Sequence, residues 1–182
     1  MTNRISRLRK RALSMLITNI RDASPELRQS AISALGQTRD VSLFESLQPA
    51  LRDPVATVQA QAAEALGQLG ERKAVPILLP SLDGKNPANV RVAAAHALNL
   101  LGDARGSAAL TEMLTSSEDD LRLRAAFLLC EQAHPGALAL LNTLLAQSKL
   151  PDGIALGALS CLARSGDTDA RKRLVQKIEL EG

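Results

Sequence analysis

The side chains that could do chemistry are few in this sequence, and they stand far apart. His96 and His134 are its two histidines, and Cys130 and Cys161 are its two cysteines. A zinc or iron site needs three or four ligands, and a nucleophilic thiol needs a neighbouring base that lowers its pKa. Neither pattern occurs, so the sequence predicts no catalytic residue, no metal site and no cofactor, and it leans away from an enzyme.

The histidines and cysteines are expected to have structural roles. His96 is predicted to lie on an outer helix face, and His134 in a turn before Pro135. The cysteines form no Cys-x-x-Cys motif, which predicts reduced thiols in a cytoplasmic protein, with Cys161 as a small buried apolar residue. No apolar run reaches about 18 residues and the amino terminus lacks the apolar core of a secretory signal, so no membrane insertion is expected.

Basic residues gather at both ends of the chain. The formal net charge is +3, and five basic residues between positions 4 and 11 leave −2 for the remainder. Two basic patches are predicted, at Arg4, Arg7 and Arg11 on one helix face and at Arg171, Lys172 and Arg173. Such patches can contact phosphates, but aromatic residues that would stack on bases make up only 1% of the chain. A solvated cap is favoured over nucleic-acid binding.

The elements that carry these residues repeat along the chain. Val58, Val90, Leu121 and Ile154 are each followed by apolar residues 4, 7 and 8 positions later, and Leu27 opens an earlier copy. Helix-type segments that recur about every 32 residues indicate stacked helix pairs. We therefore predict an all-α fold, a right-handed α-solenoid of about five helical pairs behind an N-terminal capping helix.

The predicted organisation is one domain over residues 1–182. The cap helix is expected at 4–22, and the repeats at about 23–53, 54–83, 84–115, 116–147 and 148–182. The first helix of several pairs is predicted to end at a glycine in the left-handed conformation, at Gly70, Gly102 and Gly166. Arg39 and Ala133 stand at the matching positions of the first and fourth pairs.

The best-matched copies, at residues 58–70 and 90–102, resemble bacterial HEAT repeats, and most closely the HEAT-like repeats of the phycobilisome-lyase class. The resemblance covers nearly the whole chain. It implies that an Asp at the end of one pair bonds to the Arg that opens the next helix. The implied pairs are Asp22 with Arg28, Asp83 with Arg91, and Asp119 or Asp120 with Arg122 or Arg124, whereas Gln59 replaces the Arg after Asp53 and leaves that carboxylate as a cap.

The resemblance also implies that the second helix of each pair lines an inner, concave wall. Residues beside the apolar stripe of these helices form a predicted surface for a protein partner: Glu45, Gln48, Pro76, Ile77, Leu79, Ala109, Thr111, Leu140 and Asn142. They could equally pack against neighbouring second helices. The main functional prediction is a non-enzymatic scaffold or adaptor. A bilin lyase-like subunit acting on a phycobiliprotein is the alternative, and nucleic-acid binding through the basic ends is the second alternative.

Overall fold

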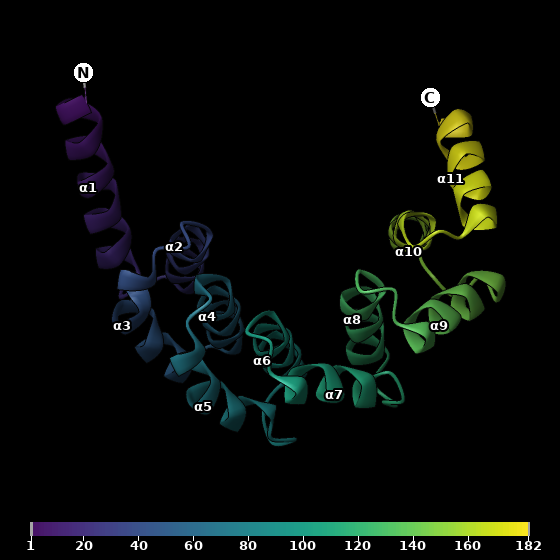
Figure 1. Cartoon of the computed structure of the whole chain (residues 1–182), viewed down its shortest axis with the longest axis horizontal. Coiled ribbons are helices and arrows are strands. Elements are labelled where there is room, and N and C mark those ends of the chain that lie inside the picture. Colours follow the sequence, from purple (N-terminus) through teal and green to yellow (C-terminus); the bar gives the residue numbers. More distant parts are fainter. Residues whose placement is uncertain (1, 182) are drawn as a thin grey trace. The chain divides into compact units, whose positions relative to one another are not determined.

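The computed structural model describes the backbone of residues 2–181 and the side chains of residues 7–179, and every regular element in this range is a helix (Figure 1). Helix α1 covers Thr2–Asn19, where the sequence predicted 4–22. Five helix pairs follow it, which confirms the predicted all-α solenoid fold. Within the described residues, no helix is both long and apolar enough to cross a membrane.

The first helix of each pair is a regular α-helix. These helices are α2 (Pro25–Gln37), α4 (Ala56–Leu69), α6 (Ala88–Leu100), α8 (Asp119–Cys130) and α10 (Asp152–Arg164). At the start of α2, the Ser24 hydroxyl accepts a hydrogen bond from the Leu27 amide at 3.3 Å, as expected of a capping serine before proline. Their Ala- and Leu-rich faces are buried, because small side chains and strong helix formers suit closely packed helices.

The second helices differ along the chain. In the first two pairs they are short α-helices that continue as 3₁₀ segments: α3 (Phe44–Leu47) with η2 (Gln48–Arg52), and α5 (Val75–Leu78) with η4 (Leu79–Leu82). They begin from the 3₁₀ turns η1 (Val41–Leu43) and η3 (Arg72–Ala74). Pro49 and Pro80 lie in the first turns of η2 and η4, where a missing amide breaks the α-helical ladder. The later second helices, α7 (Ala104–Met113), α9 (Pro135–Ala146) and α11 (Thr168–Glu181), are regular.

The chain divides into two compact units, Met1–Ser107 and Ala108–Gly182. A continuous core runs through the first unit from Ile20 to Leu101, with Leu35, Leu66 and Leu98 fully buried. The first helices approach each other closely there. A Cβ on Gly36 would lie 2.8 Å from the Cα of Ala65, and one on Gly67 would lie 2.6 Å from the Cα of Ala97. Glycine is therefore required at both positions.

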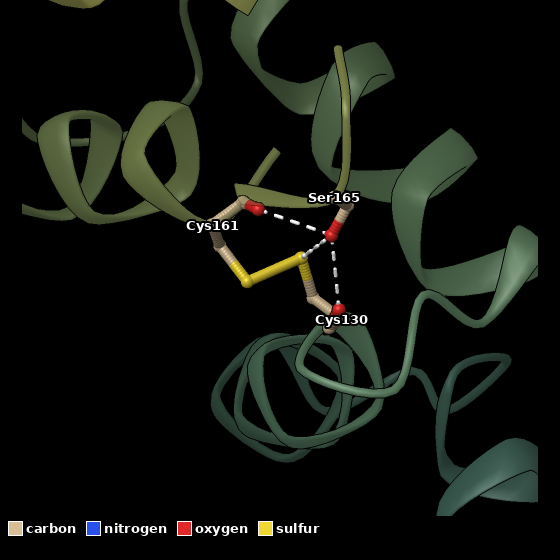
Figure 2. Close-up of a disulfide and its surroundings, with 3 residues drawn as sticks. All are labelled: Cys130, Cys161 and Ser165. Atoms are coloured by element: carbon tan, nitrogen blue, oxygen red, sulfur yellow. Dashed lines mark hydrogen bonds between the residues drawn. A yellow bond between two sulfur atoms is a disulfide. The ribbon is translucent and has the colours of Figure 1, made fainter. Parts of the chain in front are cut away.

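A disulfide between Cys130 and Cys161 joins α8 to α10 in the second unit (Figure 2). Both residues are buried, and the hydroxyl of Ser165 lies within hydrogen-bond distance of the Cys130 and Cys161 carbonyl oxygens, at 3.2 and 3.1 Å. The prediction of two reduced thiols is wrong, because these side chains project from adjacent helices toward one another. The expected reduced cysteines were the sequence-based reason for a reducing compartment, so that reason no longer holds.

The helix ends follow the glycine prediction and extend it. Gly70, Gly102 and Gly166 all adopt positive φ, at 77°, 72° and 98°, so their predicted left-handed conformation is confirmed. Arg39 and Ala133 adopt the same conformation without being glycine, with φ of 52° and 53°. The chain therefore turns out of the helix in the same way at these repeats, at the cost of backbone strain.

Candidate partner-binding surface

Three of the predicted partner-binding residues share one groove in the first unit. Gln48, Pro76 and Ile77 line a groove of about 520 Å³ together with Leu51, Arg52 and Ser81. These residues come from two successive second helices, α3 with η2 and α5 with η4. The groove therefore brings together three residues of two second helices for which the sequence predicted contact with a partner.

The groove has an apolar floor and a polar rim. Leu51 and Ile77 are half-buried and pack against the core, whereas Arg52 and Pro76 are exposed. Amide side chains at the groove hydrogen-bond to backbone carbonyls just after η2 and within η4. Gln59 Nε2 donates to the Asp53 carbonyl at 2.6 Å, and Asn86 Nδ2 donates to the Pro80 carbonyl at 2.9 Å. A groove of this kind can take an apolar side chain and offer hydrogen bonds beside it.

Two other predicted residues of the first unit lie differently. The exposed carboxylate of Glu45 meets Lys73 Nζ at 3.5 Å, and the same ammonium lies 4.1 Å from the centroid of the Phe44 ring. Leu79 is half-buried and packs against the core. Leu79 is not among the residues that line the groove, and its predicted contact with a partner stays a prediction.

The remaining four predicted residues belong to the second unit. Ala109 and Leu140 are half-buried, and Thr111 and Asn142 are exposed. Asn142 Nδ2 donates to Asp167 Oδ2 at 3.1 Å, so it holds the turn between α10 and α11. The structure gathers only part of the predicted surface into one groove.

The position of the second helices differs from the prediction in the first unit. Within residues 1–107, α2, α4 and α6 form the inner row of the curve, and α3 and α5 form the outer row (Figure 1). The close approach at Gly36 and Gly67 draws the first helices together on the inner side. The expected concave wall of second helices is therefore not found in this unit.

The basic patches also divide between the units. Arg7 and Arg11 are exposed on α1, and the side chain of Arg4 lies outside the described residues. On α11, Arg171 and Lys172 are exposed, whereas Arg173 is half-buried and pairs with Asp169 at 4.0 Å.

The implied Asp–Arg pairs are partly confirmed. Arg122 pairs with Asp119, and Arg124 Nε lies 3.0 Å from Asp120 Oδ2. The carboxylate pairing of Asp22 with Arg28 is wrong, because Arg28 Nη1 donates instead to the backbone carbonyl of Asp22 at 2.9 Å. The pair of Asp83 with Arg91 stays a prediction.

Asp53 is the carboxylate that Arg28 contacts, and it is more than a cap. Arg28 Nε donates to Asp53 Oδ2 at 2.7 Å, and Nη2 donates to Oδ1 at 2.8 Å. Oδ1 also accepts from the Val55 amide at 2.9 Å. Hydrogen bonds from Arg28 lower the pKa of the Asp53 carboxyl, and the same bonds raise the pKa of the Arg28 guanidinium.

The two histidines lie on separate elements. His96 is half-buried on α6, rather than a plain surface residue, and His134 precedes α9 at the predicted turn. Among side chains the structure describes, no three of the metal-binding types come together as a candidate metal site.

The disulfide is the feature that the sequence reasoning missed. Cys130 stands at the repeat position of Gly36 and Gly67, and Cys161 at that of Ala65 and Ala97. The structure shows that these two positions face each other between successive first helices. The placement of the two cysteines at these two repeat positions was the sequence signal from which the disulfide could have been predicted.

Comparison with known proteins agrees with this architecture. The family model for HEAT repeats matches residues 13–99 and 45–126. Phycocyanobilin lyase subunit alpha of Picosynechococcus sp. (strain ATCC 27264 / PCC 7002 / PR-6) is 29% identical over 146 residues, covering 69% of this chain and 54% of the relative. The chain thus spans about half the length of that curated relative.

Two solved structures share the fold. The complex of CpcE and CpcF of phycocyanin lyase from Nostoc sp. PCC7120 matches with a TM-score of 0.55 and 24% identity, over 93% of this chain and 70% of the other. Kap121p matches with a TM-score of 0.50 and 16% identity, over 88% of this chain and 20% of the other. The helix pairs repeat in sequence and in space, and the HEAT-repeat family model matches more than half of the chain. This chain therefore belongs to the HEAT-repeat family.

Proposed function

We propose that this chain is a non-enzymatic protein-binding module and that the groove between α3–η2 and α5–η4 holds a segment of its protein partner. The groove carries the proposal, because it brings three predicted contact residues together over an apolar floor. A repeat array presents extended surface, and its function lies in what that surface binds.

The groove defines the kind of segment that would fit. Ile77 and Leu51 offer apolar contact to one inserted side chain of the partner. Gln48 and Ser81 can hydrogen-bond to the backbone of an extended segment, and Arg52 favours a carboxylate nearby.

A variant that adds negative charge tests the groove. Pro76→Glu with Arg52→Glu places two carboxylates on exposed rim positions and should leave the core intact. Ser30→Glu with Arg39→Glu, at exposed positions of the first pair, makes the same change in net charge elsewhere and serves as the matched control. Both variants should match the wild type in circular dichroism.

The readout is affinity purification from the source cells with quantitative mass spectrometry, followed by titration of the purified partner. A partner retained by the wild type and the control should lose affinity at least about tenfold with the groove variant, as for a contact that contributes more than about 1 kcal/mol. A partner that binds all three proteins equally would contradict the proposal.

A lyase-like subunit is the second candidate, favoured by the similarity to phycocyanobilin lyase subunit alpha. The chain, alone or with a companion subunit, would then help to attach a bilin to a phycobiliprotein. The test incubates it with bilin and the bilin-free phycobiliprotein, then looks for colour that stays on the protein after denaturation. No chain-dependent colour, with any companion tried, would remove this candidate.

Three further predictions have direct tests. A gel shift across a salt series tests nucleic-acid binding, which should appear at low salt if the basic ends bind phosphates. Fractionation of the source cells tests the cytoplasmic location. A single cooperative unfolding transition of the full chain tests the proposed single-domain organisation over residues 1–182.

A further inference from the structure

Helix α1 leaves two large apolar side chains in solvent. Leu8 and Met15 are each 60% exposed. They are seven residues apart, which places them on one face about two turns, or about 10 Å, from each other. Leu13, Leu16 and Ile17 of the same helix pack against the core of the first unit. Leu8 and Met15 therefore contribute nothing to that core.

Basic side chains lie directly beside this apolar pair. Arg7, Arg11 and Met15 follow one another at intervals of four residues, so they form a ridge along the helix. Arg7 and Arg11 are exposed, as are Arg9 and Lys10. The sequence has no acidic residue before Asp22. This face of α1 thus joins an apolar strip to a strip of positive charge that no acidic residue of the helix itself offsets. The Asp40 carboxyl lies close enough to Arg9 that, after the hydrogen bonds from Ser42, the Arg9 charge also lowers its pKa.

We infer that this face of α1 binds an acidic amphipathic helix of a protein partner. Apolar side chains of that helix would cover Leu8 and Met15, and its Asp or Glu residues would meet Arg7 and Arg11. Because the face is positively charged, a complementary partner carries negative charge. The spacing of Leu8 and Met15 matches the i, i+7 anchor residues of a helix that lies along α1.

Other occupants fit the same face less well. A membrane surface needs a broad apolar face, and Leu13, Leu16 and Ile17 of α1 already pack against the core. Nucleic acid would set phosphates against Leu8 and Met15, and α1 has no aromatic residue for base stacking. A two-fold contact with a second copy would place α1 opposite α1 and bring like charges together.

Helix α11 provides a natural control. It also exposes apolar side chains, Val175 and Ile178, and basic ones at Arg171 and Lys172. Unlike α1, its sequence also holds three acidic residues, Asp169, Glu179 and Glu181, which offset part of the positive charge, and Asp169 lies 4.0 Å from Arg173. The α1 surface is also separate from the groove of the second helices, and each proposal can fail without the other.

The probe is a fluorescein-labelled helical peptide of about 18 residues, with Leu at i, i+4 and i+7 spacings and Glu on the flanks. One control peptide has the same composition in scrambled order, and another has Lys in place of Glu. Binding to the full chain is followed by fluorescence anisotropy. The acidic amphipathic peptide should bind at least about tenfold more tightly than either control and should weaken when salt rises from about 50 to about 300 mM.

Paired variants then locate the site. Leu8→Ser with Met15→Ser, and separately Arg7→Glu with Arg11→Glu, should each weaken peptide binding at least about tenfold, as expected for anchor residues. Val175→Ser with Ile178→Ser and Arg171→Glu with Lys172→Glu, on α11, should leave it unchanged. Circular dichroism establishes that each variant keeps its helix content. If an α1 variant loses helix, the comparison of the three peptides on the wild-type chain still decides.

Several outcomes would overturn the inference. Equal binding of the scrambled peptide would show unspecific charge attraction, and equal losses with the α11 variants would place the site elsewhere. Tighter binding of phosphatidylserine vesicles or duplex DNA than of the peptide would identify a different occupant. A dimer in light scattering that the Leu8→Ser and Met15→Ser changes abolish would identify a second copy.

Discussion

Arg28 and Asp53 form a two-point contact between the first helix pair and the start of the second. Their Nε–Oδ2 and Nη2–Oδ1 distances are 2.7 and 2.8 Å, and only 11% and 9% of the two side chains is exposed. A planar guanidinium matches a carboxylate in this geometry, and partial burial limits screening by salt. The contact therefore fixes how two neighbouring repeats stack.

Arg28→Lys should lower the thermal midpoint even though it keeps the charge. An ammonium cannot donate to both Asp53 oxygens and reach the Asp22 carbonyl as the guanidinium does. Asp53→Asn should cost about 1.5 to 3 kcal/mol of unfolding free energy, as for a lost hydrogen bond to a charged group. Thermal and urea unfolding measure both changes. Arg52→Lys, at an exposed position, is the control, and an equal loss there would contradict the assignment.

Gly67→Ala should destabilise the chain by about 1 to 3 kcal/mol, since overpacking of a tight interface has costs of this size. The added methyl would lie 2.6 Å from the Cα of Ala97, which is backbone and cannot swing aside. Gly84→Ala serves as the control, because a Cβ there meets nothing within 4 Å. Urea unfolding compares the two variants, and equal stability would show that α4 and α6 can separate without cost.

The disulfide should stabilise the second unit. It closes a loop of 31 residues, and loop closure of that length is worth about 3 to 4 kcal/mol in the chain-entropy description. Reduction by a phosphine, or Cys130→Ala with Cys161→Ala, should lower the unfolding midpoint. Alanine suits position 161, where the other repeats carry Ala65 and Ala97. A midpoint that does not respond to the reductant, with a thiol assay confirming reduction, would contradict this.

The fold was largely predictable because it is a sum of local patterns. The recurring apolar positions after Val58, Val90, Leu121 and Ile154 show that each repeat carries the same apolar helix face. Each of these faces is buried by stacking on the neighbouring repeats. The change from α-helix to 3₁₀ helix within the first two second helices was not predicted, although Pro49 and Pro80 indicate it. Each of these prolines lies in a second helix, where it converts the end of an α-helix to 3₁₀ geometry.

The site was less predictable because it depends on contacts between repeats. Ile77 and Leu79 lie two residues apart in one second helix, yet only Ile77 lines the groove. Sequence spacing along a single helix cannot show that. The partner of Arg28 was placed one repeat too early for the same reason. The family pattern pairs residues within a turn, whereas Asp53 lies 25 residues onward and meets Arg28 only after stacking.

Asp103 makes stability depend on pH below about 4. Hydrogen bonds from the Arg105 guanidinium and then from its backbone amide lower the pKa of this carboxyl from 3.8 to about 2. Because the folded pKa is depressed, the stabilising effect is complete above the unfolded pKa near 4 and is lost as pH falls through about 2. The wild type should exceed Asp103→Asn in stability at pH 7, and the gap should shrink between pH 4 and 2.

Acid titration of the unfolding midpoint for both proteins measures this gap. Glu112→Gln, which removes an exposed carboxylate from α7, controls for the change in net charge. A difference between wild type and Asp103→Asn that stays constant down to pH 2 would show that the Arg105 contact does not favour the charged form.

Ala133→Gly and Ser148→Gly should each stabilise the chain by about 0.5 to 1 kcal/mol. Both residues have positive φ, at 53° and 52°, where a Cβ costs about 1 to 2 kcal/mol. Glycine removes this strain, but part of the gain is lost because glycine has more conformational entropy in the unfolded chain. Gly102→Ala should have the opposite effect for the same reason. Ala139→Gly, at an exposed position inside α9, should cost about 1 kcal/mol and shows that glycine is favourable only where φ is positive. Urea unfolding of the four variants decides, and a loss of stability in Ala133→Gly comparable to that in Ala139→Gly would contradict the left-handed assignment.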